Sequence, residues 1–127
     1  MKQELQQILF DRYPLIFADI EKNPNESLMS FGICTGDGWF WLIDKLCAQL
    51  QFDIDNNREP QIVAFQVKEK YGSLRFYLET ESTAKQDAMI SFAENLSRSI
   101  CEVCGSTNNV KIRGTGFLKT RCDDCNK

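Results

Sequence analysis

Four cysteines near the C-terminus are the residues of this sequence whose types and spacing best define a chemistry. They form two Cys-x-x-Cys pairs, Cys101/Cys104 and Cys122/Cys125, with 17 residues between Cys104 and Cys122. This spacing is typical of a four-cysteine zinc site, because the sulfurs of both pairs can converge on one ion. A thioredoxin-like redox pair is disfavoured, since no βαβ pattern surrounds either motif. We therefore expect one zinc ion per chain.

The expected role of this zinc is structural. Four thiolates fill a tetrahedron and leave no coordination position open for water, and the chain contains no histidine. An enzyme that pairs Asp37 with Lys68 or Arg75 is a weaker alternative, because the sequence offers neither a histidine base nor a phosphate-binding loop. We therefore expect a protein that is not an enzyme.

The segment between the two cysteine pairs predicts a small hairpin. The stretches "VKIR" and "FLKT" flank a turn at Gly114-Thr115-Gly116, and four apolar residues should pack against the metal: Val110, Ile112, Phe117 and Leu118. Four cations share this segment: Lys111, Arg113, Lys119 and Arg121. Four thiolates and Zn²⁺ contribute −2, which takes the formal charge of −3 to about −5. The cations therefore either neutralise this anionic centre or contact phosphate.

The strongest strand signal lies in residues 61–80, "QIVAFQVKEKYGSLRFYLET". Its alternating apolar residues predict two antiparallel strands, and a two-residue turn at Tyr71-Gly72 keeps the apolar side chains on one face. This register places Val67 opposite Phe76, and Phe65 opposite Leu78. A three-residue turn would set Lys68 against Phe76 and break the apolar face.

The opposite face of this hairpin is a candidate binding surface. It carries Gln66, Lys68, Arg75 and Tyr77, with Lys68 directly opposite Arg75. Like charges so placed are unfavourable by on the order of 0.2–1 kcal/mol, and a neighbouring anion would relieve them. We expect Asp37 to pair with Arg75, and Lys68 to face a partner. The alternative is an ordinary solvated sheet face.

Three helices should surround this hairpin. The first spans residues 3–12, with an apolar stripe at Leu5, Ile8 and Leu9. The second runs from about 39 to 52 after an Asp37 cap, and its dense apolar residues require cover on most faces. The third runs from about 83 to 100 after a Ser82 cap, with a stripe of Ala84, Ala88, Phe92, Leu96 and Ile100.

These elements predict an α+β fold in which helices pack on a small antiparallel sheet. Residues 1–100 should form the body and residues 101–127 a zinc module docked on it, because the third helix runs directly into Cys101. Cys34 and Cys47 are expected to be small core residues, since neither has a histidine partner for nucleophilic catalysis.

Three motifs in this order resemble a family of small bacterial and phage-associated proteins of uncharacterised function. They are "GDGW" (36–39), "VKEKYGSLRFY" (67–77) and the paired cysteines, and the resemblance covers about residues 28–125. It implies a zinc-binding accessory protein and supplies no reaction. The positions that match its motifs are Asp37, Trp39, Lys68, Tyr71, Gly72, Arg75 and the four cysteines.

Composition narrows the class of partner. The hydrophobic share of 43% supports a folded core, and no apolar run approaches the roughly 18 residues of a membrane span. The N-terminus lacks the apolar core of a signal peptide, so we expect a cytoplasmic protein. We expect a protein partner bound through Asp37, Trp39, Lys68, Arg75 and Tyr77, such as a host protein in a phage or prophage setting. Nucleic-acid binding through the basic residues is the alternative, which the acidic net charge disfavours.

Overall fold

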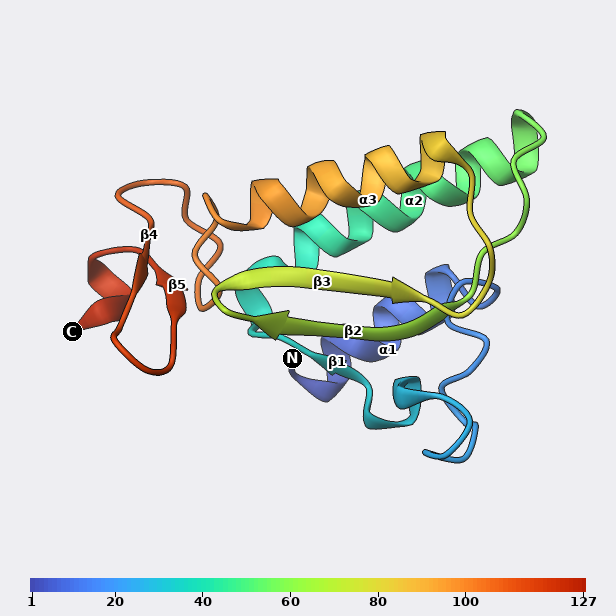
Figure 1. Ribbon diagram of the computed structural model, residues 1–127. Coiled ribbons are helices and arrows are strands. Elements are labelled where there is room, and N and C mark those ends of the chain that lie inside the picture. Colours follow the sequence, from blue (N-terminus) through green and yellow to red (C-terminus); the bar gives the residue numbers. More distant parts are fainter.

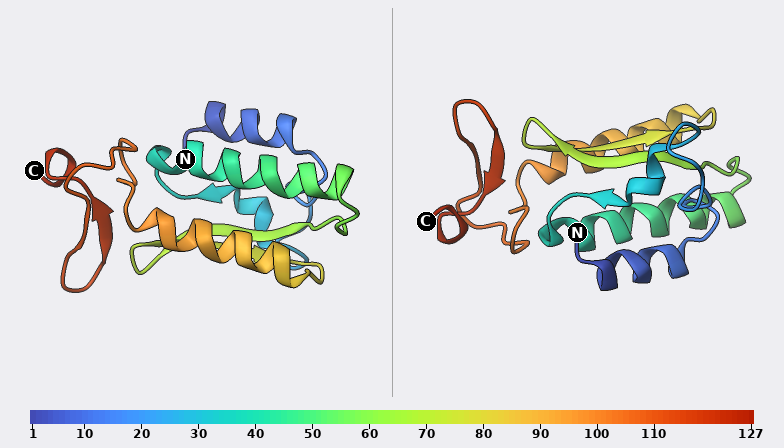
Figure 2. Two further views of the ribbon diagram at one scale, coloured as in Figure 1. Left: turned by 90° about the horizontal axis from the view of Figure 1, so that it is seen from above. Right: turned by 90° about the horizontal axis from the view of Figure 1, so that it is seen from below.

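The computed structural model describes all 127 residues and has two layers with a small appended hairpin (Figure 1). Helices α2 (Phe40–Asn56) and α3 (Ala84–Ser97) lie side by side on one face of a three-stranded sheet, and α1 (Gln3–Arg12) lies alongside α2 (Figure 2). The sheet comprises β1 (Ile33–Cys34), β2 (Ala64–Lys70) and β3 (Ser73–Leu78). Strands β4 (Lys111–Arg113) and β5 (Lys119–Arg121) form a separate hairpin at one end.

The α+β class is confirmed, with one addition to the predicted sheet. The strand order is β1-β2-β3, and β1 runs parallel to β2, whereas β2 and β3 are antiparallel. The parallel pair arises because α2 crosses over between β1 and β2, as such connections require. The sheet is therefore mixed and not purely antiparallel.

The predicted turn of the β2–β3 hairpin is confirmed. Tyr71 and Gly72 adopt φ angles of 53° and 82°, as a two-residue type I′ turn demands. Lys68 lies opposite Arg75, one residue beyond the pairing of Val67 with Phe76.

The predicted pairing of Phe65 with Leu78 is wrong because β2 contains a bulge. Ala64 pairs with Leu78, Gln66 pairs with Tyr77, and Phe65 is the extra residue between them. A bulge reverses the side-chain alternation along a strand, so Ala64 is buried before it and Val67 after it.

The start of α2 also differs from expectation. A 3₁₀ turn (Asp37–Trp39) precedes the helix, and the Asp37 side chain makes no cap bond. Its carboxylate instead accepts a hydrogen bond from the backbone N–H of Lys2 at 2.7 Å. Two large side chains of the helix, Trp41 and Phe52, remain exposed, so the helix is less covered than its composition suggested.

The third helix buries a different face from the predicted stripe. Thr83, and not Ser82, caps α3 in a reciprocal capping box with Gln86. The buried residues are Gln86, Ile90, Ala93 and Ser97, whereas Ala84, Ala88, Phe92 and Leu96 are exposed; of the predicted stripe only Ile100, beyond the helix, is buried.

Strand β3 explains this rotation of α3. As an edge strand it has free backbone N–H groups, and two polar side chains of α3 accept from them: Ser97 Oγ from Leu74 at 2.9 Å and Glu94 Oε2 from Phe76 at 2.8 Å. Unpaired buried N–H groups are unfavourable, so these contacts draw the polar residues of α3 toward the sheet.

One core of 20 buried residues joins the helices to the sheet. It includes Leu9, Ile16 and Phe17 from the N-terminal segment and Cys47 from α2, as expected for a small core residue. Cys34 is exposed, against expectation. None of the helices combines the length and apolar character needed to cross a bilayer.

Candidate metal centre and its junction with the body

The four predicted cysteines come together at the end of the molecule. Their Sγ atoms all lie within 4.8 Å of one another, and Cys104 Sγ lies 3.7 Å from Cys122 Sγ. A tetrahedral ion with bonds of about 2.3 Å requires sulfurs about 3.8 Å apart. All four cysteines are free of disulfides. The cluster therefore fits a metal ion with four soft ligands.

Backbone geometry shapes the first half of this centre. Gly105 has a φ of 81°, and its N–H donates to the carbonyl of Cys101 at 2.9 Å, which closes a tight knuckle. The second half ends differently, in a 3₁₀ turn (Asp124–Asn126). The β4–β5 hairpin between the halves is confirmed, but Phe117 is 91% exposed and does not belong to its core.

The thiols of the cluster do not ionise alike. Burial opposes ionisation of Cys101, yet backbone N–H groups of Cys104, Cys122 and Val103 outweigh it and lower its pKa to about 6. Hydrogen bonds with the sulfurs of Cys104 and Cys122, reinforced by burial, raise the pKa of Cys125 to about 12. One thiolate thus forms easily while a neighbour retains its proton, and a bound cation would remove this mutual opposition.

Two of the four cations in the hairpin have carboxylate partners within the protein. Arg113 Nη2 lies 2.5 Å from Asp123 Oδ1, and Lys119 Nζ lies 2.8 Å from Glu69 Oε1. Lys111 and Arg121 form no ion pair. Arg113 and Lys119 are therefore engaged in structural contacts.

The GDGW motif docks the first cysteine pair onto the body. The N–H of Gly38 donates to the carbonyl of Glu102 at 2.8 Å, and the N–H of Gly36 donates to Glu102 Oε2 at 3.0 Å. Trp39 is fully buried, and its indole N–H donates to the carbonyl of Ile100 at 2.8 Å. A Cβ on Gly38 would lie 2.1 Å from the carbonyl oxygen of Cys101, so only glycine permits this approach.

The Tyr71-Gly72 turn docks the β4–β5 hairpin onto the body. The hydroxyl of Thr120 donates to the carbonyl of Gly72. One oxygen of Glu69 accepts from the N–H of Gly72 at 2.8 Å, while the other pairs with Lys119. The single carboxylate of Glu69 thus orders the Tyr71-Gly72 turn and also holds the β4–β5 hairpin.

The three sequence motifs therefore meet at one junction. The GDGW loop, the Tyr71-Gly72 turn and the cysteine module lie far apart in the chain, yet each contacts another there. Sequence reasoning missed Glu69, Glu102 and Thr120, which resemble ordinary solvated residues until their contacts are known.

The predicted binding residues separate into two groups. Asp37 and Trp39 belong to the junction: Asp37 pairs with Lys2, at 3.8 Å from its Nζ, and Trp39 has no exposed surface. The expected ion pair between Asp37 and Arg75 does not form. Lys68, Arg75 and Tyr77 remain together on the face of the β2–β3 hairpin opposite the buried side chains of Val67, Leu74 and Phe76. Figure 1 shows α2 and α3 together on one side of the sheet.

Comparison with protein-family models, with curated proteins and with solved structures finds no match to this chain.

Proposed function

We propose that this chain is a noncatalytic binding protein in which a zinc-braced α+β scaffold presents its open sheet face to another protein. The observation that supports this proposal is the uncompensated charge of that face. Lys68 and Arg75 lie directly opposite each other, and neither takes part in any of the eight ion pairs of the structure.

The neighbourhood of this pair extends the surface. Tyr77 is 39% exposed beside Arg75, and Cys34 lies next to Lys68 across the β1–β2 pair. Exposed tyrosine and arginine are common energetic centres of protein interfaces, and unpaired cations favour an acidic partner surface. Because the sequence resembles phage-associated proteins, a host protein is the partner that we favour in a phage or prophage setting.

We assign the metal as zinc. Four thiolates in a closed tetrahedron suit Zn²⁺, whose role here is to hold the module folded against the body. Purified protein should contain one zinc per chain, measured by elemental analysis under reducing conditions. Cys34→Ser should retain that content, whereas Cys104→Ser should lower it; a disulfide in place of the metal would contradict the assignment.

Nucleic-acid binding is the second candidate. Tyr71 is 67% exposed, and Lys70 Nζ lies 5.5 Å from its ring centre. Tyr71 and Tyr77 could therefore stack on bases beside the cations. The protein's acidic net charge weakens this candidate. We expect no measurable binding of a fluorescent single-stranded oligonucleotide at physiological salt; a submicromolar complex that weakens steeply with salt would favour it instead.

The decisive experiment compares binding with stability. A partner captured from cells that carry the gene is purified and titrated against the wild type, Lys68→Ala, Arg75→Ala and, as a control, Arg98→Ala on the helical side. The free energies of unfolding of the two sheet variants should lie within roughly 0.5 kcal/mol of the wild-type value, and their affinities for the partner should fall at least tenfold. Variants that bind like the wild type would show that the sheet face is merely solvated.

A further inference from the structure

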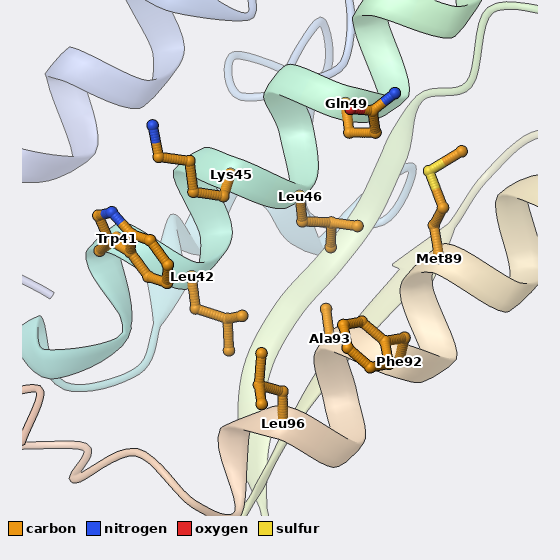
Figure 3. A pocket seen from close by; sticks show the side chains of 9 residues that line it. All are labelled: Trp41, Leu42, Lys45, Leu46, Gln49, Met89, Phe92, Ala93 and Leu96. Carbon is orange, nitrogen blue, oxygen red and sulfur yellow. The ribbon is translucent and has the colours of Figure 1, made fainter. Parts of the chain in front are cut away.

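A groove runs between α2 and α3 on the side of the molecule opposite the open sheet face (Figure 3). Its volume is about 310 Å³, and its floor is formed by Leu42, Leu46 and Ala93. The side chains along its two rims are Trp41, Lys45 and Gln49 from α2, and Met89, Phe92 and Leu96 from α3.

Three large apolar side chains of this groove are open to solvent. Trp41 is 60% exposed, Phe92 is 69% exposed and Leu96 is 37% exposed. Single exposed apolar residues are normal, but several gathered around one groove mark an interaction site. No other element of the chain covers them in the structure.

The sequence of α3 explains why this apolar surface is left over. Ile90 and Ala93 serve the core, whereas Phe92 and Leu96 fall on the neighbouring face and pack against nothing on their outer side. Helix α3 therefore has apolar side chains that the fold does not bury, and they lie along one line on its surface.

The spacing of the rim residues determines the shape of an occupant. They recur every fourth residue along α2, at positions 41, 45 and 49, so the groove follows the helix axes. Eight residues of α-helix extend about 12 Å, which is slightly more than two helical turns. A helix laid in such a groove presents apolar anchors at positions i, i+3 or i+4, and i+7.

The charge of the groove selects among possible occupants. Lys45 is its one charged lining residue, and it takes part in none of the protein's ion pairs. A second copy seated symmetrically on this face would bring two unpaired lysines into one interface, which is unfavourable. An acidic side chain beside an apolar stripe complements the groove on both counts.

We propose that the α2–α3 groove binds an amphipathic α-helix of a partner protein, with apolar anchors over two turns and an acidic residue that pairs with Lys45. This site is independent of the open sheet face, so the two surfaces can be occupied at the same time.

The proposal is tested with a displayed library of random 16-residue peptides selected on the zinc-loaded full chain. Enriched peptides should share apolar residues at i, i+3 or i+4, and i+7 with a neighbouring Asp or Glu, and should gain helical circular dichroism on binding. Phe92→Ser should weaken their affinity at least tenfold, and Lys45→Glu at least fivefold. Tyr77→Ala, on the sheet face, should leave their affinity unchanged.

Four outcomes would overturn the proposal. They are failure to enrich any peptide, enriched peptides whose affinity Phe92→Ser does not change, a dimer in sedimentation that Phe92→Ser dissociates, and binding to phosphatidylcholine–phosphatidylglycerol vesicles that Phe92→Ser abolishes. The last two would assign the groove to a second copy or to a bilayer. None of them bears on the sheet face, whose test uses Lys68 and Arg75.

Discussion

At the scale of single residues, the two glycines of GDGW matter for the space they leave and not for backbone freedom. A Cβ on Gly36 would lie 2.3 Å from the carbonyl oxygen of Glu102, and one on Gly38 would lie 2.1 Å from that of Cys101. Both contacts are with backbone, which cannot move aside as a flexible side chain can. These glycines therefore allow the loop to lie directly on the cysteine knuckle.

Gly38→Ala should destabilise the protein by about 1–3 kcal/mol, because the added methyl group must push the cysteine module away from the body. Urea unfolding of the zinc-loaded protein measures this loss. Gly116→Ala is the matched control, since a Cβ there meets nothing within 4 Å. Equal stability of the two variants would show that the junction is looser than the structure indicates.

At the scale of elements, a polar side chain links the two helices that lie side by side on the sheet. Asp53 near the end of α2 accepts from Asn57 Nδ2 at 2.6 Å, and its other oxygen lies 3.5 Å from Lys85 Nζ on α3. The Asn57 hydrogen bond, helped by Gln49 and Lys85 and opposed by burial, lowers the pKa of Asp53. A lowered pKa means that the folded state favours the ionised carboxylate.

This shift fixes the sign of a pH effect. Asp53 contributes stability above the ordinary pKa of an aspartate, about 4, and that contribution is lost as the pH falls through the lowered folded-state pKa. Asp53→Asn should therefore be less stable than the wild type at pH 7, and the difference should shrink toward pH 3. Urea unfolding across this range measures it, and a constant difference would contradict the assignment.

The β2–β3 hairpin carries a second element-scale prediction. Because Lys68 and Arg75 repel each other, Lys68→Gln should leave the protein as stable as the wild type, or more stable by about 0.2–1 kcal/mol. Glu69→Gln should act oppositely and lower stability by about 0.5–1.5 kcal/mol, since it weakens the turn and the partly exposed ion pair with Lys119. Thermal melts of both variants at low salt separate these effects.

At the scale of the whole molecule, the cysteine module contacts the body through several independent contacts. The backbone of Glu102, the hydroxyl of Thr120 and the carboxylate of Glu69 each contribute one. The module has few apolar residues of its own, and Phe117 contributes almost no buried surface. In the zinc-bound state that we propose, metal binding and docking together keep it folded.

Removal of the metal by a chelator should therefore unfold the module first and loosen the parts of the body that contact it. Amide exchange should rise in residues 102–126, in the GDGW loop and at the Tyr71-Gly72 turn, while α1 and the far end of α2 stay protected. Hydrogen-exchange mass spectrometry before and after chelation measures this pattern. Uniform loss of protection would indicate that the body cannot fold without the metal.

Local signals in the sequence determined the parts of this protein that depend on short-range chemistry. The cysteine spacing identified the four residues that cluster as a possible metal site, and Tyr71-Gly72 fixed the turn and with it the opposition of Lys68 and Arg75. These features follow from residues adjacent in the chain, where spacing and backbone preference suffice.

The buried faces of the helices and strands, and the contacts between residues distant in the chain, depend on long-range packing that the sequence does not display. The rotation of α3 follows from hydrogen bonds between β3 and α3, and the bulge at Phe65 becomes visible only when β2 is paired with β3. No periodicity in these segments reveals either feature. Asp37 pairs with Lys2 and not with Arg75, and Trp39 is buried, because the GDGW loop docks the cysteine module and does not face the open sheet. Phe92 and Leu96 belong to an apolar stripe that the sequence assigns to the core. Such a stripe shows that one face of a helix is apolar, and only the packed structure shows whether the rest of the chain covers it.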